Sequence, residues 1–246
     1  MTGRIALVTG GIGGIGTEIC RSLAASGCRV IACDLPATDE RLARFSASLA
    51  GADVHFEAAD VSRMEDCEAL LRRVNDKHGP VSVLVNGAGI TRDVSLRKMT
   101  SEQWHEVLRV NLDSVFNLCR VVADGMCERG FGRIVNVSSI IGQTGAFGQS
   151  NYAAAKAGMH GFTMALAREL AGKGVTVNSV SPGYIDTAMT AAIPEELRRQ
   201  MISAIPVGRI GTAEDVARAI AFLCDERSSY LTGVNLPVNG GLFISF

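Results

Sequence analysis

The chain has 246 residues, a length that a single α/β domain commonly reaches. Lys and Arg number 24 against 25 Asp and Glu, so the net charge of −1 provides no bulk field that would attract nucleic acid or an anionic membrane. Apolar runs such as 219–224 are far shorter than the roughly 18–20 residues that span a bilayer. We therefore expect neither a nucleic-acid-binding nor a membrane protein.

The N-terminus and the cysteines predict a cytoplasmic location. Residues 1–4 run directly into an apolar segment, without the basic and apolar regions of a secretory signal. Seven cysteines form an odd set with no C-x-x-C pair and no histidine at zinc spacing. We expect reduced, mostly buried thiols and no metal site.

Short apolar runs rich in Val and Ile alternate with helical stretches along the whole chain. Such runs are typical of strands buried on both faces of a parallel sheet. The alternation predicts an α/β fold, a single doubly wound domain over 1–246, with its ligand crevice beyond the carboxyl ends of the strands. The seven predicted strands are Ile5–Val8, Arg29–Cys33, Val54–Glu57, Val81–Val85, Gly132–Val137, Val175–Ser179 and Gly233–Val238.

A glycine-rich turn over 9–16 follows the first strand and opens an amphipathic helix. Glycines let the backbone approach a pyrophosphate closely, and a helix N-terminus offers free N–H groups and a partial positive charge. The turn between strand and helix therefore predicts a dinucleotide-binding site. The residues expected to bind the cofactor here are Gly10, Gly13, Gly14, Ile15 and Gly16.

Asp34 ends the second strand, 24 residues after Gly10. A carboxylate in this place accepts hydrogen bonds from adenosine ribose hydroxyls and repels a 2′-phosphate. No Lys or Arg lies inside the glycine turn to offset that repulsion, although Arg41 and Arg44 follow a few residues on. The sequence therefore favours NAD(H) over NADP(H).

Two later helices carry start and stop signals. Ser62 with Glu65 predicts a capped helix that ends at Gly79-Pro80. Ser101 is expected to cap another, with an apolar stripe that extends to Phe116.

The fifth strand runs into Ser139, and Tyr152 and Lys156 follow on a helix. Residues four apart lie on one helical face. A tyrosine titrates near pH 10, and a nearby cation would favour its phenolate and lower that pKa. Farther on, the irregular stretch 183–211, with a helical piece near 194–202, predicts a substrate lid over about 184–210.

With these motifs, the chain resembles the short-chain dehydrogenase/reductase family over essentially its whole length. The resemblance rests on Thr9, Gly10, Gly14, Gly16, Asp60, Val61, Asn111, Ser139, Tyr152, Lys156 and the segment 181–187. It implies a sheet in the order 3-2-1-4-5-6-7. It also implies that Asn111 anchors a proton-relay water beside Lys156, and that Ser139 holds the substrate oxygen next to Tyr152.

The resemblance further implies how the cofactor is held. Asp60 and Val61 would contact adenine, and 182–187 would hold the nicotinamide ribose and carboxamide. One departure exists: the family's N-N-A-G reads Asn86-Gly87-Ala88-Gly89, so a side chain that braces the sheet is absent. The implied cofactor-binding residues of this part of the chain are Asp60, Val61, Asn86, Gly87, Ala88, Gly89, Tyr152, Lys156, Pro182, Gly183, Ile185 and Thr187.

Within the family, the segments 89–93, 97–100, 132–136 and 148–152 resemble β-ketoacyl thioester reductases. The segments 161–167, 174–178 and 181–185 are similar to acetoacetyl-CoA reductases of polyhydroxyalkanoate synthesis. This resemblance implies a homotetramer whose helices around 101–128 and 151–171 pack in pairs. The implied substrate-binding residues are Asp93, Lys98, Ser139, Phe147, Gln149, Tyr152 and Tyr184.

The resulting hypothesis is an NADH-preferring reduction of acetoacetyl-CoA to 3-hydroxybutyryl-CoA, with Tyr152 as proton donor. One alternative is a 3-oxoacyl-carrier-protein reductase, whose acidic partner requires a basic rim at the entrance. Another is a non-catalytic NAD-binding protein, against which the intact set of four catalytic residues argues. The basic rim would come from Arg129, Arg133, Arg168 and Lys173.

Overall fold

The computed structural model describes residues 1–186 and 195–244. Seven strands form one parallel sheet, and each of the seven predicted runs overlaps one of them. Most of the observed strands extend one to three residues beyond the predicted carboxyl ends, and the last one begins two residues later than predicted. The strands are β1 Ile5–Thr9, β2 Arg29–Asp34, β3 Val54–Ala58, β4 Val81–Asn86, β5 Gly132–Val137, β6 Val175–Pro182 and β7 Asn235–Val238.

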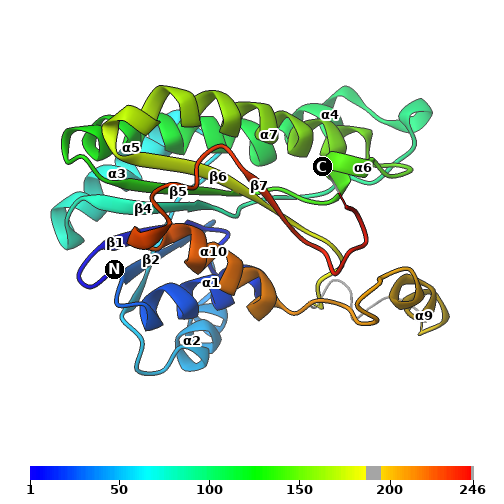
Figure 1. The fold of residues 1–246 in the computed structure, drawn as a ribbon, viewed down its shortest axis with the longest axis horizontal. Coiled ribbons are helices and arrows are strands. Elements are labelled where there is room, and N and C mark those ends of the chain that lie inside the picture. The colour runs from blue at the N-terminus through cyan, green and yellow to red at the C-terminus, as the bar shows by residue number, and fades with distance from the viewer. Residues whose placement is uncertain (187–194, 245–246) are drawn as a thin grey trace.

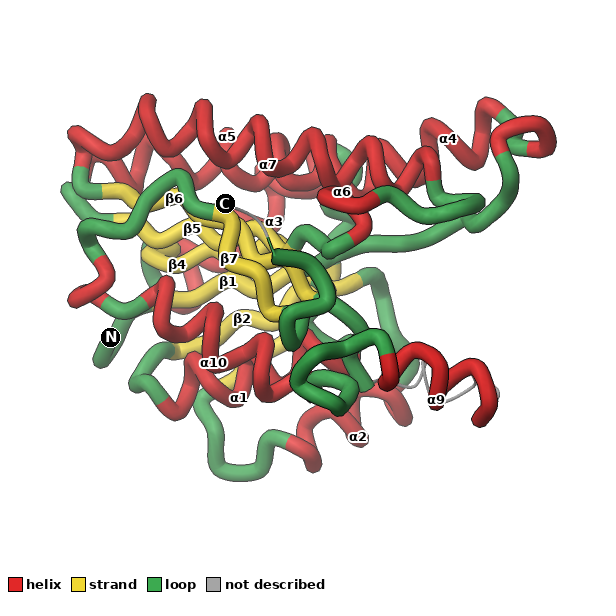
Figure 2. Tube along the Cα trace, turned by 45° about the vertical axis from the view of Figure 1, so that its right-hand side comes forward, coloured by secondary structure: helices red, strands yellow, loops and turns green. Residues whose placement is uncertain are grey.

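Helices cover both faces of the sheet (Figures 1 and 2). Helices α3, α5 and α7 lie on one face, and α1 and α10 lie on the other. The helix α9 projects from the body of the molecule, and none of its side chains is buried. The α-helices are α1 Gly14–Ala25, α2 Asp39–Ser48, α3 Met64–His78, α4 Ser101–Leu108, α5 Ser114–Glu128, α6 Ile141–Thr144, α7 Ser150–Leu170, α9 Glu195–Ser203 and α10 Ala213–Cys224.

The strand order is β3-β2-β1-β4-β5-β6-β7, as the family resemblance implies. Every neighbouring pair is parallel. The order reverses at β1, which lies between β2 and β4, and such a switch point opens a crevice beyond the carboxyl ends of the strands. The predicted doubly wound fold is therefore confirmed.

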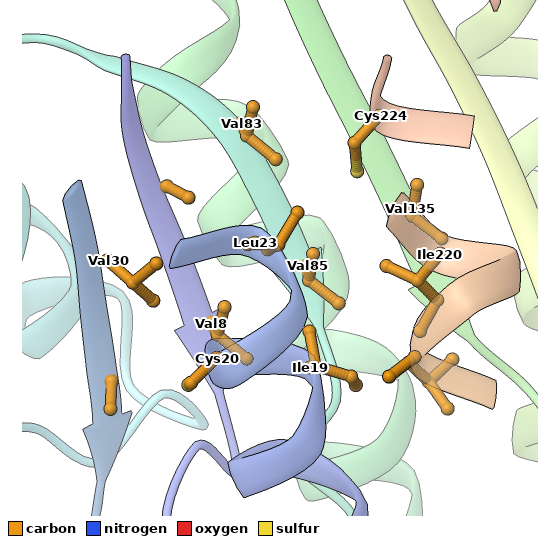
Figure 3. Close-up of a cluster of buried hydrophobic side chains, with 14 of the residues drawn as sticks. Val8, Ile19, Cys20, Leu23, Val30, Val83, Val85, Val135, Ile220 and Cys224 are labelled. Atoms are coloured by element: carbon orange, nitrogen blue, oxygen red, sulfur yellow. The ribbon is translucent and has the colours of Figure 1, made fainter. Parts of the chain in front are cut away.

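Two apolar cores sandwich the sheet, because successive strand residues point to opposite faces. In β1, Ala6 and Val8 face α1 and α10, whereas Ile5 and Leu7 face the helices on the other side. Figure 3 shows the first of these cores, where strand valines meet side chains of α1 and α10. Each fully buried Ile or Leu contributes about 2 kcal/mol of transfer free energy, so these layers hold the strand ends, and thus the crevice, in place.

The predicted N-caps of two helices are each wrong by one residue. Helix α3 begins at Met64, and the Ser62 hydroxyl donates to Asp60 instead of capping the helix. Helix α4 is capped by Thr100, whose side chain accepts from the backbone N–H of Gln103 at 3.2 Å; Ser101 is the first helical residue. The predicted stop at Gly79 is confirmed, since its φ of 103° suits glycine alone.

The predicted apolar stripe along 101–116 is interrupted by a π-helical turn, η2 (Arg109–Asp113), which joins α4 to α5. Its extra residue shifts the helix register, so Val107 and Val115 remain buried whereas Phe116 is 49% exposed. The prediction for Phe116 is therefore wrong. Such turns frequently occur at functional sites, and this one carries Asn111.

Candidate active site

In the turn after β1, glycines let the backbone pass close to the segment after β4 and to the first turn of α1. Gly10 has φ +64°, and a Cβ at this position would lie 2.8 Å from the carbonyl oxygen of Gly87. A Cβ on Gly16 would overlap the carbonyl oxygen of Gly10. Only glycine fits at either place, and the closed turn leaves the first turn of α1 facing the crevice.

Helix α1 begins without a side-chain cap. Its N-cap is Gly13, and Gly14 and Ile15 follow as its first residues. The first N–H groups of a helix have no intrahelical partner, and with the helix dipole they form a site for a phosphate. The glycine cradle and this uncapped N-terminus fit the pyrophosphate of a dinucleotide.

Asp34 is the last residue of β2, as predicted, and its side chain is 20% exposed. One carboxylate oxygen accepts from the backbone N–H of Leu35 at 2.9 Å. The other lies 3.9 Å from a guanidinium nitrogen of Arg41. The carboxylate is therefore placed at the strand end, and a cation stands beside it.

Asp60 and Val61 follow β3 at the same edge of the sheet. One oxygen of Asp60 accepts from the N–H (3.0 Å) and the hydroxyl (2.7 Å) of Ser62. The backbone oxygen of Val61 accepts from the Asn117 side chain at 3.1 Å, and the Val61 side chain is 7% exposed. This loop is held firmly from behind by α5.

The segment after β4 explains the departure from the family motif. The Thr9 hydroxyl accepts from the N–H groups of Gly87 and Ala88, at 3.1 and 3.2 Å. A Cβ at Gly87 would lie 2.7 Å from the backbone oxygen of Thr9, so glycine allows this close approach. The Thr9 side chain therefore joins the end of β1 to the segment after β4. Thr9 is part of the family motif, but we did not predict this role for it from the sequence.

Asn86, expected at the cofactor, has a buried side chain that points into the protein. It donates to the Asn136 side chain at 2.8 Å, and Asn136 in turn donates to the Thr163 hydroxyl on α7 at 2.9 Å. Only the backbone of Asn86 is left to meet a ligand. We did not predict this buried chain, because an asparagine inside an apolar run carries no sign of its partner.

Asn111 is fully buried in the π-helical turn. Its amide donates to the backbone oxygens of Ile90 (2.9 Å) and Val107 (2.8 Å), and its oxygen accepts from the N–H of Ile90 at 3.2 Å. A Cβ on Gly89 would lie 2.6 Å from this oxygen and 3.7 Å from the Lys156 ammonium. Asn111, Gly89 and Lys156 thus meet in one place.

Ser139, Tyr152 and Lys156 converge where β5 ends against α7. The Lys156 ammonium donates to the backbone oxygen of Val137 at 2.7 Å and lies 5.6 Å from the centre of the Tyr152 ring. The Ser138 hydroxyl donates to the backbone oxygen of Lys156 at 3.0 Å, which ties the helix to the strand. The predicted Tyr–Lys pairing on one helical face is present.

The electrostatics of this pair differ from expectation. Burial lowers the pKa of Lys156 to about 8. Burial also raises the pKa of Tyr152, which a hydrogen bond with Ser139 opposes. Lys156 therefore does not lower the Tyr152 pKa as expected: burial and then the Asp93 carboxylate raise it, and the bond with Ser139 is what opposes them. The phenol is protonated at neutral pH, which suits a proton donor.

The segment after β6 closes the crevice on the far side. The backbone oxygen of Pro182 accepts from Ile140 at 2.9 Å, and Gly183 donates to Val238 at 3.0 Å. The buried Ile185 forms a bridge with Gly211, so both ends of the predicted lid meet. Thr187 lies outside the described residues.

The expected substrate residues fall into two groups. Gln149 donates to Asp93 at 2.7 Å, and near them Phe147 is 95% exposed. Lys98 is exposed at the end of the short helix Leu96–Lys98. Tyr184 lines a separate cleft of about 320 Å³ beside β7, so the structure does not join it to the first group.

The expected basic rim is at the wrong edge of the sheet. Arg129 donates to the backbone oxygen of Val81, the first residue of β4, and the buried Arg133 donates to Gly132 and Gly174. Lys173 lies two residues before β6, and Arg168 is near the C-terminal end of α7. Within one chain these cations lie at the amino ends of the strands, opposite Tyr152.

All seven cysteines are free thiols, and all but Cys127 are buried, as predicted. Across the described ranges, no helix is both long and apolar enough to cross a membrane. In the same ranges, no three His, Cys, Asp or Glu side chains are grouped so that they could hold a metal ion.

Comparison with known proteins agrees with this geometry. Residues 10–243 match the family model described as enoyl-(acyl carrier protein) reductase. An acetoacetyl-CoA reductase of Allochromatium vinosum is 55% identical, over 98% of this chain and 99% of that protein. The acetoacetyl-CoA reductase of Cupriavidus necator is 49% identical over the same shares. A 3-oxoacyl-(acyl-carrier-protein) reductase of Vibrio cholerae is 44% identical, over 99% of each. The chain therefore belongs to the short-chain dehydrogenase/reductase family and is an NAD(P)-dependent oxidoreductase.

Proposed function

We propose that the protein reduces acetoacetyl-CoA to 3-hydroxybutyryl-CoA, with NADH preferred as the reductant and Tyr152 as the proton donor. The observation that carries the proposal is the convergence of Ser139, Tyr152 and Lys156 beside a glycine cradle that fits a dinucleotide. The substrate assignment is supported by the relatives from Allochromatium vinosum and Cupriavidus necator, which are named acetoacetyl-CoA reductases.

Each catalytic residue has one task. Bound NADH would supply the hydride for C3 of the ketone. The Ser139 hydroxyl hydrogen-bonds the ketone oxygen, and Tyr152 delivers its phenolic proton to that oxygen as negative charge develops there. The Lys156 ammonium stabilises the resulting phenolate, and Asn111, beside it, would hold the water that returns a proton to Tyr152.

The preference for NADH rests on Asp34. Its carboxylate stands at the end of β2, where it can accept from ribose hydroxyls and repel a 2′-phosphate. A guanidinium nitrogen of Arg41 lies 3.9 Å from this carboxylate, and the pairing weakens the repulsion of a 2′-phosphate. We expect the repulsion to persist, because Asp34 itself stands at the strand end where the ribose would bind.

The acyl chain and pantetheine arm would lie along the group formed by Asp93, Gln149, Phe147 and Lys98. The segment 184–210, with Tyr184 at its start, would cover them as a lid. Phe147, 95% exposed, is available for a ligand to cover.

A carrier-protein substrate is the second candidate, favoured by the relative from Vibrio cholerae. The location of Arg129 and Arg133 at the opposite edge argues against it within a single chain. A non-catalytic NAD-binding protein would not need the buried Asn111 and Lys156.

We further propose a cytoplasmic homotetramer. Phe116 on α5 and Met164 on α7 are 49% and 53% exposed, which suits helices that pack against a second copy. Light scattering on the purified protein would give four times the chain mass, and a monomer would contradict the proposal.

The test is a matrix of two substrates and two reductants with the wild-type protein. Initial rates of nicotinamide oxidation are measured with acetoacetyl-CoA and acetoacetyl-carrier-protein, each with NADH and with NADPH. We expect the highest kcat/KM for acetoacetyl-CoA with NADH. A higher value with the carrier protein or with NADPH would overturn that part of the proposal.

A further inference from the structure

A series of polar side chains ties the catalytic helix α7 to the carboxyl end of β6 and to Asn235, the first residue of β7. His160 Nε2 lies 3.3 Å from the Ser181 hydroxyl oxygen. The Ser181 hydroxyl donates to the side-chain oxygen of Asn235 at 2.8 Å, and the Ser179 hydroxyl donates to the same oxygen at 3.1 Å. None of these side chains has a task in the mechanism above.

Counting protons fixes the direction of this series. A serine hydroxyl has one hydrogen, and Ser181 gives it to Asn235. Ser181 can therefore only accept from His160, so His160 Nε2 must carry a hydrogen and donate it. Ser181 is completely buried, so loss of His160 would leave its hydroxyl oxygen without this donor.

The contact between His160 and Ser181 joins the helix that carries Tyr152 and Lys156 to the strand end proposed to face the nicotinamide. His160 lies on α7, four residues after Lys156 and eight after Tyr152. The spacing of four residues puts His160 and Lys156 on one face of α7, and burial, followed by the Lys156 ammonium, lowers the pKa of His160. Ser181 directly precedes Pro182 and Gly183, the residues proposed to face the nicotinamide.

We propose that His160, Ser181 and Asn235 are positioning residues that set the spacing between the Tyr152 phenol and the strand end at Pro182–Gly183. The inference rests on the proposed function, because it takes the nicotinamide to lie against that strand end. Hydride and proton must reach neighbouring atoms of one ketone, and a displacement of about 1 Å costs roughly 100-fold in rate.

The test compares two substitutions at one position. His160→Leu removes the donor and keeps an apolar side chain of moderate size, whereas His160→Gln keeps an N–H donor near the place of Nε2. Glu169→Gln, on the exposed face of the same helix, is the matched control. The readouts are kcat, the KM for acetoacetyl-CoA, the primary isotope effect with 4-deuterated NADH, and the Kd for NADH from fluorescence titration.

We expect His160→Leu to lower kcat about 30-fold, to change the isotope effect, to weaken NADH binding several-fold, and to leave the KM for acetoacetyl-CoA within about twofold. His160→Gln should recover most of the loss. A purely structural role would lower the melting temperature and leave kcat of the folded enzyme unchanged. Equal impairment in the Leu and Gln variants would also overturn the proposal.

Two further arms keep the test decisive. If His160→Leu does not fold, Ser181→Ala removes the acceptor with a smaller change and should show the same pattern. If the wild type binds NADH but does not reduce acetoacetyl-CoA, the proposed function fails while the NADH Kd still decides this inference. A Kd unchanged in both His160→Leu and Ser181→Ala would then refute it.

Discussion

The two halves of the crevice differ in whether backbone or side chains form their surface. On the side of β1, β2 and α1, the surface is mostly backbone, and glycines at 10 and 16 bring chain segments into contact. On the side of β5, β6 and α7, it rests on buried polar side chains such as Asn136, Lys156 and Ser181. The first half is suited to a phosphate, which any free N–H can bind, and the second to chemistry, which needs particular groups.

The two halves should therefore respond to opposite kinds of substitution. A backbone site is damaged when an atom is added, and a side-chain site when one is removed. Substitutions that add a methyl group on one side and remove a hydroxyl or amine on the other should therefore separate binding from turnover.

The largest effect on NADH binding should come from Gly16→Ala. The added methyl group overlaps the carbonyl oxygen of Gly10 and must displace the cradle. At a cost of about 1–3 kcal/mol, NADH binding should weaken roughly 10–100-fold in a fluorescence titration. Gly161→Ala on α7 is the control, because a Cβ there has no atom within 4 Å. Equal NADH affinity in both variants would refute a backbone cradle.

Lys156→Met tests the catalytic half through pH. Burial lowers the Lys156 pKa from 10.5 to about 8, so between these values the unfolded chain binds more protons than the folded one. Stability of the wild type should therefore rise by about 2 kcal/mol between pH 7 and pH 9.5 relative to the variant. Urea titrations at both values measure this difference, and parallel pH dependence would show that the ammonium is not buried.

Asp34→Asn sharpens the account of cofactor choice. The substitution removes the repelling charge and frees Arg41 to meet a 2′-phosphate. The ratio of kcat/KM for NADH to that for NADPH should fall about tenfold, an energy of ~1.4 kcal/mol. Asp39→Asn, exposed in the first turn of α2, should leave the ratio unchanged. If both variants keep the wild-type ratio, Asp34 does not select the cofactor.

Thr163→Val should act on stability alone, because it leaves the buried amide of Asn136 without an acceptor. We expect a loss of about 1–3 kcal/mol in the free energy of unfolding. Thr176→Val is a matched control, because within the described residues the buried Thr176 hydroxyl has no hydrogen-bond partner. The chain from Asn86 through Asn136 to Thr163 matters little if both substitutions have the same effect.

The two halves also differ in how far the sequence predicts them. The glycine turn, the strand end at Asp34 and the Tyr152–Lys156 pair are local patterns, so their placement follows from strand and helix periodicity. The bonds of Asn86 to Asn136 and of His160 to Ser181 join residues 50 and 21 positions apart. The register of β4 against β5 brings Asn86 to Asn136, and the packing of α7 on the sheet brings His160 to Ser181. A linear pattern predicts neither contact.

The helix starts and the basic residues show the same limit. Helix α3 starts one residue after the predicted cap Ser62, and α4 is capped by Thr100 instead of its neighbour Ser101. Which of two neighbouring residues caps a helix depends on the geometry of the preceding loop. The π-helical turn at Asn111 depends on a side chain that competes for a backbone oxygen. Arg129 and Arg133 are identified as cations from sequence, but the edge of the sheet at which they lie follows from topology.

The most direct test of the account is Tyr152→Phe, with Tyr230→Phe, at a fully exposed tyrosine, as the control. Loss of the proton donor should lower kcat by about 100- to 10,000-fold, while fluorescence titration gives a Kd for NADH within about threefold of the wild type. A Tyr152→Phe enzyme that keeps more than about a tenth of the wild-type kcat would contradict the assignment of Tyr152.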